Sequence, residues 1–141
     1  MMKKRPVWLM LTAAIAVIFG MMTIKSGASV LFFDGEARVA AGNYVDFVLW
    51  FNFSAGFFYV VTGIGIWLEK TWATTAAVVL AVLTLLVFVA FGIHILNAGE
   101  YEQRTVVAMI IRTSVWFVIA ISCWRQSQYV SKKSEMLLRS K

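Results

Sequence analysis

The sequence has a single cysteine and a single histidine among its 141 residues. One cysteine excludes an intramolecular disulfide and a cysteine-rich metal site. One histidine excludes a haem held by two histidines of the same chain, and zinc or copper would need more ligands of the usual kinds. There is no phosphate-binding glycine loop, and no serine or cysteine has credible triad partners. We therefore expect no metal site, and nothing in the sequence indicates an enzyme that acts on its own.

Charged residues are also few, and long apolar runs lie between them. The runs cover residues 7–24, 47–68, 73–96 and 106–124. Each is near or above the roughly 18 to 20 residues that a helix needs to cross about 30 Å of hydrocarbon, and each is too long and uniform for a barrel strand. The sequence therefore predicts an all-α integral membrane protein, a four-transmembrane-helix antiparallel bundle over residues 1–124. A basic cytoplasmic tail over residues 125–141 would follow, as a surface helix or a disordered segment.

The basic residues predict how this bundle is oriented. The net charge is +6, and most basic residues flank one end of the predicted bundle: Lys3, Lys4, Arg5, Lys70, Arg125, Lys132, Lys133, Arg139 and Lys141. Because basic residues favour the cytoplasmic side, we expect both termini in the cytoplasm and the protein in a bacterial-type inner membrane. The expected partners are the anionic lipids of the inner leaflet and a membrane protein or further copies of the chain. The charge requires no nucleic acid.

Four polar side chains within the runs or at their ends are candidates for a ligand or proton site. They are Asp46, Asn52, His94 and Arg112. At a rise of about 1.5 Å per residue, all four lie in the outer half of the bundle, the half away from the cytoplasm. Ionisable side chains are rare inside membranes and are often functional there. We therefore expect the candidate site in this half.

Arg112 is the strongest of these signals. An unpaired guanidinium in hydrocarbon costs at least about 2 to 3 kcal/mol. We expect Arg112 to pair with a carboxylate of Asp46, Glu100 or Glu102, or to extend outward to the lipid head groups. Together with Arg104, the two glutamates would form a rim above the site. The pair could be structural and fix the helix register, or it could belong to an anion-binding or proton-linked site.

His94 leaves several roles open. It could be a polar side chain whose hydrogen bonds are satisfied within the bundle. Beside a carboxylate it could pass protons, and it could donate a hydrogen bond to a quinone carbonyl. A haem held by histidine and methionine, or shared between two copies of the chain, also stays open.

The second run is unusually rich in aromatic residues interleaved with small ones. One interpretation is a packed core with an aromatic belt at the outer interface. The other is a wall for a flat hydrophobic ligand such as a quinone. The wall would consist of Trp50, Phe53, Phe57 and Tyr59 from the second run and Trp116 from the fourth.

Several glycine-containing segments carry a family resemblance. The first run ends with Gly20 and Lys25-Ser26-Gly27, and the second contains Gly56 and Gly63-Ile64-Gly65. A short charged turn, Leu68-Glu69-Lys70-Thr71-Trp72-Ala73, then leads into a run rich in alanine, valine and leucine. In these features residues 15–90 resemble the DoxX-like family of small four-helix membrane proteins. That family often has an acidic residue where this chain has Asn52. The resemblance implies a partner subunit of a membrane redox system, such as quinone-linked sulfur oxidation.

These features together predict a small auxiliary subunit of a quinone-linked redox complex in the inner membrane. Its polar cluster would contact quinol or an anionic substrate beside the aromatic wall. The sequence fixes no cofactor, with a quinone as the first candidate and haem as the second. A small oligomeric transporter or channel, for anions or linked to protons, is the first alternative function. A structural or assembly protein is the second.

Overall fold

The computed structural model describes residues 5–140, which form helices joined by short loops. The helices are α1 (Val7–Leu31), α2 (Glu36–Ala41), α3 (Asp46–Trp67), α4 (Thr71–Leu96) and α5 (Gln103–Arg139). Lys3, Lys4 and Lys141, which contribute to the predicted orientation, lie outside the described residues. Four of the helices, α1, α3, α4 and α5, are long and apolar enough to cross a membrane.

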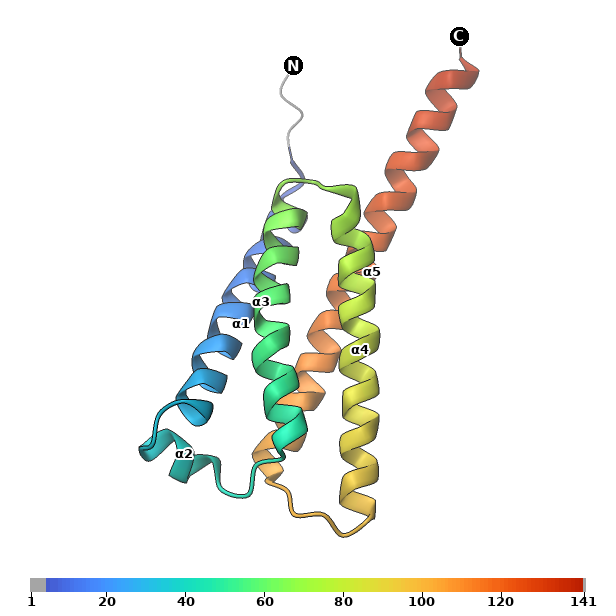
Figure 1. Ribbon diagram of the computed structural model, residues 1–141. Coiled ribbons are helices and arrows are strands. Elements are labelled where there is room, and N and C mark those ends of the chain that lie inside the picture. Colours follow the sequence, from blue (N-terminus) through green and yellow to red (C-terminus); the bar gives the residue numbers. More distant parts are fainter. Residues whose placement is uncertain (1–4, 141) are drawn as a thin grey trace.

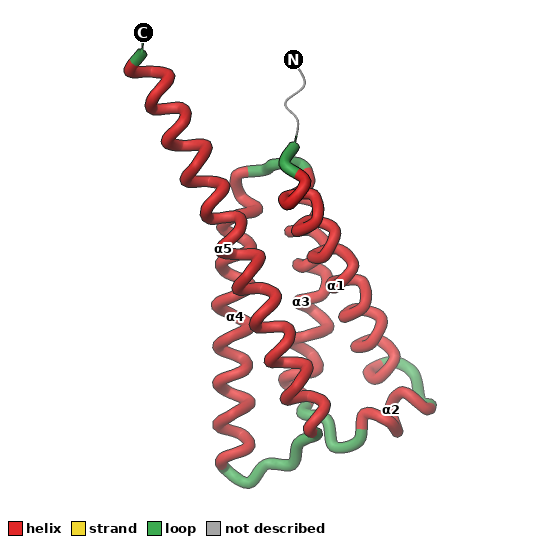
Figure 2. The backbone as a smooth tube through the Cα atoms, turned by 180° about the vertical axis from the view of Figure 1, so that it is seen from behind, coloured by secondary structure: helices red, strands yellow, loops and turns green. Residues whose placement is uncertain are grey.

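The four long helices run up and down in the order in which they follow one another (Figure 1). Both ends of the described chain and the α3–α4 turn lie at one end of the bundle, the terminal end. Helix α2 and the α4–α5 loop lie at the other, the loop end. Seen from behind, α5 crosses the bundle obliquely beside α1 (Figure 2). The predicted all-α, four-helix antiparallel bundle is confirmed, and membrane insertion and orientation stay predictions.

Two helices extend beyond the apolar runs. Helix α1 continues to Leu31 through Lys25 and Ser26 and ends shortly before the Asp34–Gly35 bend. Helix α5 continues without a break to Arg139, because residues 125–139 contain neither proline nor glycine to end it. The predicted tail is therefore the last part of α5, which projects past the bundle (Figure 1).

Helices α1 and α3 pack with their backbones in contact. A Cβ atom added at Gly20 of α1 would lie 2.8 Å from the carbonyl oxygen of Gly56 in α3. A Cβ atom added at Gly63 would lie 3.1 Å from the carbonyl oxygen of Ala13. Small residues at a helix interface permit this approach, and packing of this kind drives helix association in lipid.

The centre of the bundle holds a closely packed aromatic core. Tyr59 of α3 and Trp116 of α5 are fully buried, with ring centroids 4.4 Å apart. The Tyr59 hydroxyl lies 3.4 Å from the hydroxyl of Thr84 in α4, so its polar atom is hydrogen-bonded inside the core. Phe19 of α1 lies against Tyr59 at 6.1 Å.

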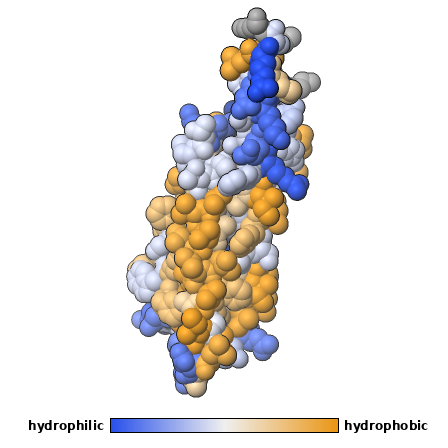
Figure 3. Space-filling model, turned by 90° about the vertical axis from the view of Figure 1, so that its right-hand side faces the viewer, coloured by the Kyte–Doolittle hydropathy of each residue, from blue (hydrophilic) through white to orange (hydrophobic). Residues whose placement is uncertain are grey.

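The surface is apolar along the bundle and polar at its ends. In the view of Figure 3, hydrophobic residues cover the middle of the visible face. Hydrophilic residues gather at the loop end and along the projecting part of α5. A broad apolar band between two polar ends matches the profile of a bilayer.

Candidate functional site: a pocket at the loop end

A pocket of about 600 Å³ lies at the loop end, between α1, α2, α3 and α5. Its walls come from residues 22–30 at the end of α1, from the alanines of α2, and from residues 44–52 around the start of α3. The first turns of α5, up to Arg112, complete it. Residues of the α2–α3 and α4–α5 loops, among them Tyr44 and Glu102, also line it.

Arg112 is the most deeply placed cation of the pocket. The residue is only 8% exposed, and its guanidinium carbon lies 5.7 Å from the ring centroid of Phe19. One terminal nitrogen donates to the sulfur of Met109 at 3.7 Å, and the other to the hydroxyl of Thr23 at 3.5 Å. The Nε–H group has no partner. Because sulfur is a weak acceptor and 3.5 Å is long for a hydrogen bond, this buried charge is poorly satisfied.

The predicted carboxylate partner of Arg112 is absent from the described residues. Across residues 5–140, the ion pairs are Arg5–Glu69 and Arg38–Asp34. The prediction that Arg112 pairs with a carboxylate or extends outward to the surface is wrong in this structure, since its side chain is both buried and unpaired. The depth of the guanidinium along its helix can be estimated from the sequence. Whether it meets a carboxylate depends on how the neighbouring helices are rotated about their axes.

Asn52 reaches the same point from α3. Its amide nitrogen donates to the sulfur of Met109 at 3.7 Å, the sulfur that Arg112 also contacts. Its amide oxygen is buried without a partner. The base of the pocket therefore offers N–H donors from two helices, the Thr23 hydroxyl from a third, and one unused acceptor.

The rim of the pocket is polar. Lys25, Glu102 and Arg104 all line it. A carboxylate oxygen of Glu102 accepts a hydrogen bond from the backbone N–H of Asn43 at 2.9 Å, which joins the α2–α3 and α4–α5 loops. Gly42 has a φ of +60°, a backbone conformation that favours glycine, and a Cβ atom there would displace the Glu102 carboxylate.

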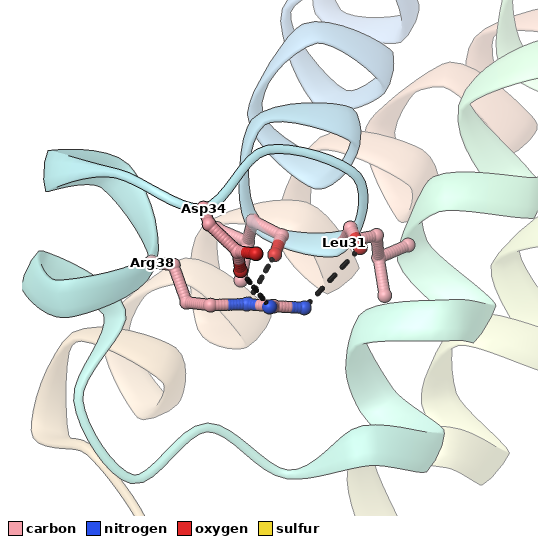
Figure 4. Close-up of polar contacts among 4 residues, drawn as sticks. Leu31, Asp34 and Arg38 are labelled. Carbon is pink, nitrogen blue, oxygen red and sulfur yellow. Dashed lines mark hydrogen bonds and ion pairs between the residues drawn. The ribbon is translucent and has the colours of Figure 1, made fainter.

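Arg38 holds α2 beneath the pocket, a role that the sequence did not indicate. Its guanidinium donates to the carbonyl oxygens of Val30 at 3.0 Å and Leu31 at 3.3 Å and pairs with Asp34 (Figure 4). These are two of the last carbonyls of α1, which have no partner within the helix. A cation at a helix C-terminus is also favoured by the helix dipole.

Asp46 and His94 do not join Asn52 and Arg112. Neither lines the pocket. Asp46 is exposed at the start of α3. The His94 ring lies 3.0 Å from the backbone carbonyl oxygen of Glu100 and meets the ring of Phe47 edge-on at 6.1 Å. The predicted cluster is thus divided, because His94 faces the α4–α5 loop. Glu100, too, lies outside the pocket lining.

The predicted aromatic wall is divided as well. Trp50, Phe53 and Phe57 stack edge to face along the outside of α3. Tyr59 and Trp116 lie in the buried core, farther from the loop end than Arg112. Residues 50, 53 and 57 recur at helical spacing on one face, whereas position 59 points to the opposite face. None of the five lines the pocket, so one continuous wall is a wrong prediction.

Together these features define a class: an all-helical bundle able to cross a membrane, with a pocket at one end and a poorly satisfied arginine at its base. Comparison with protein-family models, with curated proteins and with solved structures finds no match. The resemblance to the DoxX-like family therefore stays a prediction. Within residues 5–140, no group of three or more histidine, cysteine or carboxylate side chains could hold a metal ion.

Proposed function

We propose that the chain is a multi-pass membrane protein, with both termini on the cytoplasmic side, that binds an organic anion in the loop-end pocket. The observation that supports this most directly is the buried Arg112 guanidinium, which has no carboxylate partner among residues 5–140. A buried charge without a counter-ion costs several kcal/mol, so an anion at this position would relieve that cost.

The chemistry of the pocket suits an oxyanion. Carboxylate and phosphate oxygens accept paired hydrogen bonds from a guanidinium, and such charge-assisted bonds are the strong ones. Lys25 and Arg104 add positive charge at the rim. The carboxylate of Glu102 is already engaged by a backbone N–H group. A pocket with this excess of positive charge attracts anions toward its base.

An auxiliary role in a quinone-linked complex is the second candidate. It is favoured by the neutral Asn52 amide beside Arg112, which could donate a hydrogen bond to a quinone carbonyl oxygen. The positions of His94 and of the aromatic residues give it less support. An anion needs the positive charge of Arg112, whereas a quinone needs only an N–H donor. Arg112→Gln removes the charge and keeps such a donor, so it separates the two candidates. Quinone in the lipid extract of that variant, at the wild-type ratio, would favour the second candidate.

The test is thermal unfolding of the full chain in a neutral detergent, with and without added anions. The probes are acetate, inorganic phosphate and oleoyl-lysophosphatidate. We expect at least one of them to raise the Tm of the wild type and to leave Arg112→Gln unchanged. Arg125→Gln, the same change at an exposed site on α5, is the matched control and should respond like the wild type. Equal responses in the wild type and Arg112→Gln, or no response to any probe, would contradict the proposal.

A further inference from the structure

The pocket is far larger than a small anion requires. Its volume of about 600 Å³ lies in the range of sites for whole organic ligands, which is about 300 to 1,000 Å³. Much of its lining is apolar, with side chains from two helices and a loop: Met22, Val30, Val45, Val48 and Leu49. An inorganic ion on Arg112 would leave these walls without contacts. The lining therefore fits a ligand with an anionic group and an apolar part.

The pocket also opens to the side of the bundle, between α1 and α5. Met22 on α1 is 66% exposed, and Ala108 on α5 is exposed, although both line the pocket. Figure 2 views the bundle from the side on which α5 and α1 lie in front of α3. Residues next to the pocket lining along the chain, Met21 on α1 and Val107 and Ile111 on α5, are large, apolar and exposed. In a bundle that spans a bilayer, such a surface faces hydrocarbon.

We infer that the ligand is an amphiphile with an oxyanion head and a hydrocarbon chain. The head lies between Arg112 and the rim cations, and the chain leaves between Met22 and Ala108. This inference rests on the proposed function and goes beyond it in naming the ligand class. The same head chemistry could come from a membrane lipid or from a soluble phosphate ester. The side opening favours the lipid, since a soluble anion needs only the polar rim.

Three matched probes separate the two sources. Oleoyl-lysophosphatidate carries both head and chain, glycerol 3-phosphate carries the head alone, and 1-oleoylglycerol carries the chain on an uncharged head. We expect the first to bind at least about tenfold more tightly than either of the others. Over glycerol 3-phosphate, burial of two methylene groups is worth about that factor. Over 1-oleoylglycerol, the gain comes from charge-assisted hydrogen bonds between the oxyanion and Arg112. The measurement is a titration of the full chain in neutral detergent, followed by thermal unfolding.

The outcomes distinguish this inference from the proposed function. If glycerol 3-phosphate binds as tightly as oleoyl-lysophosphatidate and binding needs Arg112, the anion site stands and the amphiphile is rejected. If no probe binds in an Arg112-dependent way, both are rejected. If 1-oleoylglycerol binds as tightly as oleoyl-lysophosphatidate, the oxyanion head is rejected.

The side opening has its own test. Ala108→Trp should lower the affinity for oleoyl-lysophosphatidate by a larger factor than that for glycerol 3-phosphate. Ala90→Trp on α4, also exposed and outside the pocket, is the matched control. Because a tryptophan at 108 could impair folding, the wild type is also cross-linked with a lysophosphatidate that carries a diazirine in its chain. We expect adducts at Met22 and around Ala108. Adducts confined to the aromatic residues on the outer face of α3, Trp50, Phe53 and Phe57, would overturn the proposed route.

Discussion

Helix α1 meets its two neighbours in opposite ways. Toward α3 it presents Ala13 and Gly20, and the backbones of the two helices touch. Toward α5, near the loop end, it presents Thr23 and Lys25, and the helices stay apart around a pocket. One helix thus forms both a close-packed seam of the bundle and a wall of the loop-end pocket.

The difference shows that a close helix seam needs small residues on both partners. Opposite Gly20, α3 provides Gly56, so nothing keeps the helices apart. Opposite Thr23, α5 provides Arg112, whose long, charged side chain does not fit between two helix backbones in contact. Small residues exclude water and ligands from one side of α1, and the arginine keeps the other side available to them.

The largest effect is expected from Gly56→Leu, which would break the closed seam. A Cβ atom at this position lies 2.8 Å from Ile24 and 3.1 Å from the carbonyl oxygen of Gly20, so the two backbones would have to separate. We expect a loss of about 3 kcal/mol in the free energy of unfolding, at the upper end for overpacking. Thermal unfolding in detergent measures it.

Gly92→Leu provides the control for this substitution. Gly92 lies within α4, and a Cβ atom there would have no neighbour within 4 Å. Replacing glycine by a good helix former in an open position should leave the stability equal or slightly higher. Equal losses for the two variants would mean that close packing between α1 and α3 is not what distinguishes this side of α1.

A smaller effect of opposite sign is expected from Arg112→Met on the open side. In protein stripped of lipid, the substitution removes a buried charge that lacks a counter-ion and keeps the apolar volume. We expect stability to rise by about 2 kcal/mol, in line with the cost of arginine within a membrane helix. Arg125→Met, at an exposed site, should change stability by less than about 0.5 kcal/mol.

A loss of stability in Arg112→Met would contradict this comparison. Removing one member of a buried ion pair costs about 3 to 5 kcal/mol, because the remaining charge is left without its partner. Such a loss would indicate that Arg112 has a structural carboxylate partner. The arginine would then set the helix register, and the open side of α1 would have no binding role.

The fold was largely predictable from the sequence. Four apolar runs specified four long helices. The helix ends were less predictable. Helix α1 passes through Lys25 and Ser26 because no residue before the Asp34–Gly35 bend interrupts it. Nothing in residues 125–139 marks the end of a helix either.

The candidate site was predictable only in part. Depth along each run placed Asn52 and Arg112 at one level, and the structure brings both to Met109. Depth carries no information on rotation, so it also grouped Asp46 and His94 with them. Helical spacing could have separated Tyr59 from Trp50, Phe53 and Phe57. The role of Arg38 depends on the path of a loop, for which the sequence gives no signal.

The most direct measurement is an experimental density map of the full chain, extracted with its native lipids into nanodiscs. The proposed function and the inferred ligand class predict density that is not protein against the Arg112 guanidinium and the Asn52 amide. From there the density should continue between Met22 and Ala108 to the surface of the bundle. A carboxylate of the protein on Arg112, or a pocket filled by side chains or by water alone, would contradict the central claim that this arginine binds an anionic ligand.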